Sequence, residues 1–103
     1  DTRMAEVVPL KMSAPVTLAH IQELAADSDK IVVIQHGRQR QKERNITRKQ
    51  IEECVRQGYI AEGPFLNAHG NWQVTIAAYS AGEELACVVA IEWATRLLII
   101  TTF

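Results

Sequence analysis

Four side chains that could act together on a phosphodiester follow one another at helical spacing: His36, Arg40, Glu43 and Arg44. A helix would place all of them along one face. Cleavage of RNA through its own 2′-hydroxyl needs a base, an acid for the leaving oxygen, and cations for the charge that builds on phosphorus. His36 could transfer the proton, because imidazoles change charge in the physiological pH range, while Arg40 and Arg44 could stabilise the phosphate. The alternative is an exposed salt bridge between Arg40 and Glu43.

The same segment carries most of the positive charge of the chain. Six of the 11 Lys and Arg residues lie between Arg38 and Lys49, where only Glu43 opposes them, although the net charge of the whole chain is −1. Clustered Lys and Arg side chains are typical of phosphate contacts, so we expect an anionic partner such as RNA. Arg38, Lys42, Arg48 and Lys49 would then bind and steer it. A solvated surface helix is the alternative.

Two elements are predicted to lead into this segment. After Thr17, apolar residues recur every three or four positions up to residue 25, which predicts an amphipathic helix ending near residues 27–29. The apolar, β-branched run 31–34 is short and bounded by polar residues, which predicts a buried strand. No large apolar residue occurs from His36 to Asn45, so a helix there would have no apolar stripe to pack on a core.

The clearest predicted helix begins after the basic segment. Thr47 is expected to be its N-cap, with Gln50 completing a capping box. Ile46 and Ile51, which flank that cap, would form a hydrophobic staple. Gly58 is expected to end the helix in the left-handed conformation.

The rest of the chain is predicted to form strands separated by turns. The expected strands are Tyr59–Ala61, Trp72–Tyr79, Leu85–Ile91 and Leu97–Ile100. The turn signals between them are Gly63–Pro64, Asn67–Asn71 and Ala81–Glu83. Sequential strands joined by short turns favour an antiparallel sheet. The sequence therefore predicts an α+β fold, a small single domain whose helices pack on one face of an antiparallel sheet.

Composition sets the class of protein. With 103 residues, 48% of them hydrophobic and 22% charged, the chain resembles one ordinary soluble domain. Its apolar runs are far shorter than the ~20 residues of a membrane span. No secretory leader is recognisable, so we expect the protein to be cytoplasmic. Residues 1–11 are interpreted as an added remnant or a linker, which leaves 12–103 as the domain.

The remaining titratable and aromatic side chains give weaker signals. Cys54 and Cys87 lack a partner at metal-ligand spacing, so buried free thiols are expected, with no metal site and no cofactor. We expect no role for His20, or for His69 in its turn. Two aromatic residues on one predicted strand leave two interpretations open. Tyr79 could stack a base or contact a phosphate, and Trp72 could stack too, although a structural role is the preferred interpretation of both.

The segment from His36 to Thr47 resembles the opening motif of an uncharacterised bacterial domain family, His-Ala-x-x-Arg-Met-x-Glu-Arg-Gly-Ile-Ser/Thr. That family is related to the BrnT and MqsR toxins of the RelE-like superfamily. The resemblance extends over roughly residues 31–103, to the closing Thr101. Gly37 and Gln41 stand where the family tends to have Ala and Met. Glycine costs about 0.5 to 1 kcal/mol of helix stability relative to alanine, so we expect this helix to be frayed or to order on binding.

The resemblance implies a small RelE-like (BECR) ribonuclease fold in which RNA lies against a curved antiparallel sheet. By analogy, the catalytic positions are His36, Arg40 and Arg44, while Tyr79 and Thr101 join the basic residues in binding RNA. The implied activity is that of a toxin-type, metal-independent endoribonuclease. An antitoxin or immunity protein would have to neutralise it, whether the toxin stands alone or forms the C-terminal domain of a larger effector. The alternative is a non-catalytic RNA- or protein-binding module on the same fold.

Overall fold

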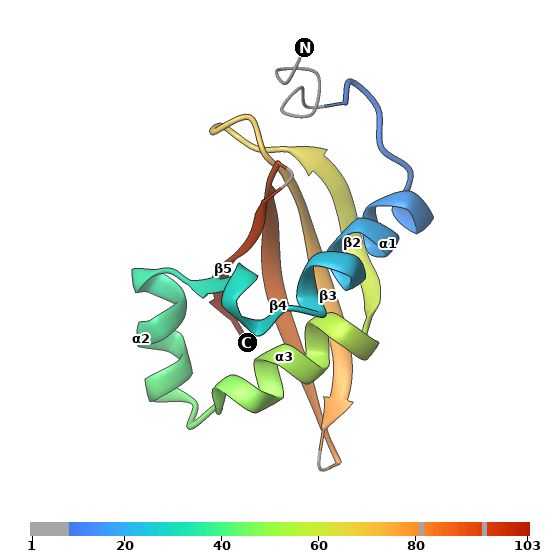
Figure 1. Ribbon diagram of the computed structural model, residues 1–103. Coiled ribbons are helices and arrows are strands. Elements are labelled where there is room, and N and C mark those ends of the chain that lie inside the picture. The colour runs from blue at the N-terminus through green and yellow to red at the C-terminus, as the bar shows by residue number, and fades with distance from the viewer. Residues whose placement is uncertain (1–8, 81, 94) are drawn as a thin grey trace.

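The computed structural model describes residues 9–80, 82–93 and 95–103, which form a small α+β domain with three α-helices packed against a five-stranded sheet (Figure 1). The helices are α1 (Ala14–Ala25), α2 (Gln35–Glu43) and α3 (Arg48–Gln57), with a short 3-10 helix, η2 (Ser28–Lys30), after α1. The strands are β1 (Ile31–Val33), β2 (Tyr59–Leu66), β3 (Trp72–Ser80), β4 (Glu83–Glu92) and β5 (Arg96–Thr102). The predicted fold class is confirmed.

The order of strands in the sheet is β1-β5-β4-β3-β2. From β2 to β5 each strand pairs antiparallel with the next one in sequence, as expected from the short turns between them. β1 departs from this pattern, because it joins the far edge and runs parallel to β5, with Ile31 opposite Leu97 and Val33 opposite Ile99. The sheet is therefore mostly antiparallel. Helices α1 and α3 lie across one of its faces (Figure 1).

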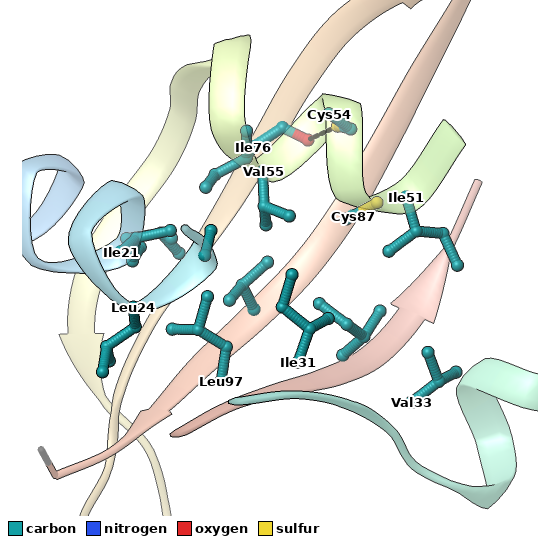
Figure 2. Close-up of a cluster of buried hydrophobic side chains, with 14 of the residues drawn as sticks. Ile21, Leu24, Ile31, Val33, Ile51, Cys54, Val55, Ile76, Cys87 and Leu97 are labelled. Atoms are coloured by element: carbon teal, nitrogen blue, oxygen red, sulfur yellow. Dashed lines mark hydrogen bonds between the residues drawn. The ribbon is translucent and has the colours of Figure 1, made fainter. Parts of the chain in front are cut away.

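One hydrophobic core fills the space between α1, α3 and the sheet (Figure 2). Successive side chains of a strand point to opposite faces, so each strand sends alternate residues toward the helices. The fully buried members include Ile21, Ile31, Ile51, Val55, Ile76, Val89, Leu97 and Ile99. The predicted buried strand over 31–34 is confirmed as β1, except that Ile34 already acts as the N-cap of α2.

The two cysteines face each other within this core (Figure 2). Both are buried free thiols, as expected, and they come from α3 and β4. The Cys54 thiol lies 3.5 Å from the Ile76 carbonyl oxygen and 3.6 Å from that of Leu85. A hydrogen bond with Cys54, reinforced by burial, raises the pKa of the Cys87 thiol. A neutral thiol at Cys87 suits its apolar surroundings.

Helix α1 begins one turn earlier than its apolar spacing predicts. Ser13 is the N-cap, and its hydroxyl accepts a hydrogen bond from the Val16 amide at 3.3 Å. Thr17, the residue expected at the start, is fully buried inside the helix, and its hydroxyl donates to the Ser13 carbonyl at 2.7 Å. The helix ends at Ala25, short of the predicted 27–29. The apolar stripe starts inside the helix because the first turn does not touch the core.

Helix α3 forms as predicted at its start and differently at its end. The capping box is complete: the Thr47 amide donates to Gln50 Oε1 at 2.8 Å, and the Gln50 amide donates to Thr47 Oγ1 at 3.1 Å. The left-handed ending is wrong, because Gly58 has an extended backbone with φ of −77° and ψ of 177°. A Cβ there would lie 2.5 Å from the Cys54 carbonyl oxygen. Glycine is needed at this position for space and not for its conformation.

One predicted turn lies inside a strand. Gly63–Pro64 interrupts β2, where the pairing with β3 shifts register, and Gly63 has a φ of +90°. This is a bulge on the edge strand, the position in a sheet where proline is tolerated. The Asn67–Asn71 turn is confirmed. Of the Ala81–Glu83 turn, Ala81 lies outside the described residues, and Gly82 follows it with a φ of +82°.

Candidate nucleic-acid interface

Helix α2 sits at the edge of the sheet, apart from the other two helices, against the second half of β5 (Figure 1). It has no apolar stripe, as the sequence predicts. Gly37 is instead the buried residue through which the helix contacts the sheet. A Cβ at position 37 would lie 2.6 Å from the Ile99 carbonyl oxygen and 3.1 Å from Val33 Cγ1. The backbone of α2 therefore packs directly on the strand. The expectation that Gly37 leaves this segment frayed is wrong, because the missing side chain is what lets the helix approach.

Gln41, one turn further along α2, is half-buried on the same side as Gly37. Positions 37 and 41 thus both face inward, which is what the Ala and Met of the similar family motif imply. The remaining positions of α2 face solvent, and they hold nearly all of its charge. The helix therefore presents its cations outward.

The predicted catalytic residues share this outer surface without forming a tight cluster. His36 lies in the first turn and Arg40 one turn later, both exposed. Arg40 forms an ion pair with Glu43 at 3.6 Å, with both side chains about half exposed, as the salt-bridge alternative predicts. Arg44 is the C-cap of α2, outside the regular helix, beside a small hollow that it shares with Glu83 and Glu84 of β4. The helical alignment thus holds for His36, Arg40 and Glu43.

The basic residues expected to bind RNA divide into two groups. Arg38 and Arg48 are engaged with the fold: Arg38 Nε donates to the Val33 carbonyl at 2.9 Å, and Arg48 Nη2 donates to the Ile31 carbonyl at 2.6 Å. Arg48 also pairs with Glu52 at 3.0 Å. Lys42 and Lys49 are exposed, and Lys42 lines a shallow hollow of about 470 Å³ between α2 and the connection 45–47 that leads to α3. The lysines are therefore better placed than the arginines to reach a phosphate chain.

Tyr79 and Thr101 lie on the sheet, away from the outer surface of α2. By register, Tyr79 is opposite Glu84 and Thr101 opposite Val88, so both belong to the sheet face that α1 and α3 leave open. Tyr79 is 74% exposed at the end of β3 and Thr101 is half-buried on β5. β4 separates their strands, so the structure does not bring these two residues together.

The open face of the sheet carries a groove that sequence reasoning missed. We call it the sheet groove; it measures about 680 Å³. Its apolar floor is formed by Ile34, Ala90, Leu98 and Ile100, and its polar rim by Gln73, Glu92 and the loop Asn67–Asn71. These residues come from segments far apart in the sequence, so only the strand order could have revealed the groove. The available signal was the turn rich in asparagine before β3.

Trp72 and His20 contact other parts of the fold, whereas His69 is exposed. Trp72 is buried and its Nε1 donates to the Pro9 carbonyl at 2.9 Å, which favours the packing interpretation. His20 stacks edge-on against Trp93, with ring centroids 4.8 Å apart. His69 is exposed at the rim of the sheet groove. Within residues 9–80, 82–93 and 95–103, no group of three or more His, Cys, Asp or Glu is arranged to hold a metal ion.

Among the described helices, none combines the length and apolar character that a bilayer span requires. The comparisons with known proteins give one match. A family model described as "Domain of unknown function (DUF4258)" covers residues 25–103, which is most of the chain and includes everything from η2 to β5. No curated protein and no solved structure matches.

Proposed function

The chain belongs to the DUF4258 family, and we propose that it acts as a metal-independent endoribonuclease of the toxin type, cleaving RNA by attack of its 2′-hydroxyl. One observation carries this proposal. A histidine and an arginine, His36 and Arg40, stand one turn apart on the outer surface of α2, a helix otherwise rich in cations. They supply a proton-transfer group and a positive charge along one line on the surface.

The first turn of α2 is suited to an anion. Its N-cap residue is Ile34, which offers no side-chain cap to the first amide groups. Free N–H groups and the positive end of the helix dipole favour a phosphate at such a terminus. A phosphate there would lie within reach of His36, which would take the proton from the 2′-hydroxyl or give one to the leaving 5′-oxygen. Arg40, one turn further on, would stabilise the charge on the phosphorus oxygens, and Arg44, at the far end of α2, would bind a neighbouring phosphate.

The ion pair between Arg40 and Glu43 is compatible with this role. An exposed pair of this kind contributes only about 0.3 to 0.5 kcal/mol, so a phosphate can take the place of Glu43 at little cost. Glu43 would then keep Arg40 extended along the helix until RNA arrives. Its carboxylate also accepts a hydrogen bond from Gln39 Nε2 at 3.2 Å, which holds it on this side of α2.

The resemblance of the His36–Thr47 motif to the RelE-like toxins supports the same activity. It implies action on RNA in the cytoplasm and a neutralising antitoxin or immunity protein. Such a partner would cover the outer surface of α2 with acidic groups. The setting could be a stand-alone toxin or the terminal domain of a longer effector.

A non-catalytic RNA-binding module is the second candidate, and one observation favours it. The side chains of His36 and Arg40 are open to solvent. Catalytic groups act best in sites that exclude water, where charges interact more strongly. A surface of this kind could hold RNA without turning it over.

Substitution of His36 separates the two candidates. We expect bacteria that express the chain to stop growing and their RNA to be cleaved, and the purified protein to cut RNA in the presence of a chelator. His36→Ala should lower the cleavage rate by roughly 10² to 10⁴-fold, the usual contribution of a general acid or base, while RNA affinity changes little. Gln35→Ala, in the same turn, is the matched control and should cleave normally. If the folded wild-type protein binds RNA but leaves it intact, the non-catalytic binding module is the candidate that remains.

A further inference from the structure

The floor of the sheet groove is an apolar surface that is partly open to solvent. Ala90 lies between Gln73 of β3 and Leu98 of β5 in register, and its small side chain leaves a depression bordered by the larger Leu98 and Ile100. Ile34, Leu98 and Ile100 remain partly exposed there. A planar ring could lie on these aliphatic side chains and remove their surface from water.

The rim of the groove is held in one conformation by a single side chain. Asn67 Oδ1 accepts the amides of His69 at 2.9 Å and Asn71 at 3.1 Å. Because its oxygen is fixed by two N–H donors, its Nδ2 must donate, and it does so to Gln73 Oε1 at 3.0 Å. Gln73 is thereby oriented with its oxygen toward Asn67. Its Nε2 group, a donor of two hydrogens, is the part left to face a ligand in the groove.

A carboxylate stands near Gln73 at the border of the floor. Glu92 is two residues beyond Ala90 in β4, so it shares a sheet face with Gln73 as a diagonal neighbour, about 7 to 8 Å away between the backbones. One of its oxygens accepts a hydrogen bond from Arg96 Nε at 2.6 Å, which holds the group in place. The carboxylate has further lone pairs and accepts only. The groove therefore offers a donor and an acceptor pair next to each other along one border of its floor.

We propose that the sheet groove binds a single guanine base of the RNA on which the proposed function acts. The Watson–Crick edge of guanine presents one acceptor, O6, followed by two donors, the N1 and N2 hydrogens. Gln73 Nε2 can donate to O6 while the Glu92 carboxylate accepts from N1 and N2. Adenine would place its N6 donor against the Gln73 donor and its N1 acceptor against the carboxylate. Uracil would place O2, also an acceptor, against the carboxylate.

The position of the groove relative to α2 fits a chain of RNA that runs from one to the other. Ile34 belongs to the floor of the groove and is also the N-cap of α2, two residues before His36. A nucleotide whose base occupies the groove would have its backbone near the first turn of α2. The guanine would thus fix which phosphate meets His36.

Binding of short RNAs that differ in one base tests the inference. The probes are fluorescently labelled U6, the same strand with one central G, and the same strand with one central A, with affinities measured by anisotropy. We expect the wild type to bind the G strand roughly tenfold more tightly than the other two, the discrimination typical of a paired base contact. Glu92→Gln, which keeps the size of the side chain but turns one acceptor into a donor, should abolish that preference, so that the three strands bind with equal affinity.

Glu53→Gln, an exposed carboxylate on α3, is the matched control and should retain the preference for G. Equal affinity of the wild type for all three strands would overturn the guanine site while leaving RNA binding by α2 standing. Failure to bind any strand would instead count against the proposed function. Preference for G that survives Glu92→Gln would also overturn the assignment, even though RNA binding and base selection would both be real.

Discussion

At the scale of single residues, Gly37 shows how a local rule can mislead. Helix propensity predicts that glycine weakens α2 by about 0.5 to 1 kcal/mol relative to alanine. The structure shows a second effect of opposite sign, because a Cβ would meet the Ile99 carbonyl oxygen at 2.6 Å. A backbone atom cannot move aside as a flexible side chain can. The packing effect is therefore the larger one.

Gly37→Ala should lower the free energy of unfolding although it improves helix propensity. Overpacking of this kind costs about 1 to 3 kcal/mol, which exceeds the propensity gain. Urea denaturation followed by circular dichroism measures the difference. Lys42→Ala, at an exposed position of the same helix, should be neutral within about 0.5 kcal/mol. A Gly37→Ala protein as stable as the wild type would mean that α2 is not packed tightly on β5.

The candidate site also divides at this scale into what spacing could reveal and what it could not. The alignment of His36 with Arg40 follows from a helical period of 3.6 residues. The use of Arg38 and Arg48 to satisfy the carbonyls of β1 could not be predicted, because it depends on where that strand lies. Gln73 and Glu92 come together only through the pairing of β3 with β4. The alignment of side chains within one helix could be predicted from the sequence, whereas contacts between different elements could not.

At the scale of elements, α3 was predicted best because its signals are local. A capping box involves residues three positions apart, and both of its hydrogen bonds are present. Gly63–Pro64 was misassigned because its two residues suit a turn or an edge bulge equally well, and only the neighbouring strand distinguishes them. The parallel partner of β1 was missed for the same reason. Nothing near residue 31 in sequence indicates a pairing with Leu97.

The capping box of α3 gives a prediction that involves no ligand. Thr47→Ala removes the acceptor for the Gln50 amide and should lower the free energy of unfolding by about 1 kcal/mol. Thr47→Ser keeps the hydroxyl and should restore most of that loss, again measured by urea denaturation. Equal losses in the two variants would show that the threonine methyl group, and not the cap, stabilises this position.

At the scale of the whole molecule, positive and negative charges nearly balance. The net charge is −1, yet exposed cations concentrate on α2 and the start of α3, while Glu83, Glu84 and Glu92 lie along β4. Long-range attraction of RNA to the protein as a whole should therefore be weak. RNA binding would depend on the few cations that it touches.

The salt dependence of RNA affinity should report those few contacts. Each phosphate neutralised on single-stranded RNA contributes about −0.7 to the slope of log K against log salt. Replacing three exposed cations, Arg40, Lys42 and Lys49, with Gln should make the slope shallower by roughly 2. Lys11→Gln, an exposed cation far from α2 in sequence, is the control and should leave the slope unchanged. An unchanged slope in the triple variant would show that α2 does not belong to the RNA interface.

The order of the strands has a consequence for synthesis. The chain leaves the ribosomal exit tunnel from its N-terminus, so α2 emerges long before β5, the strand that holds Gly37 and pairs with β1. During that interval the nascent chain exposes its basic residues, but the strand on which α2 packs and the floor of the sheet groove have not yet formed. A protein with the proposed activity would therefore remain inert toward the ribosome that makes it until β5 has left the exit tunnel.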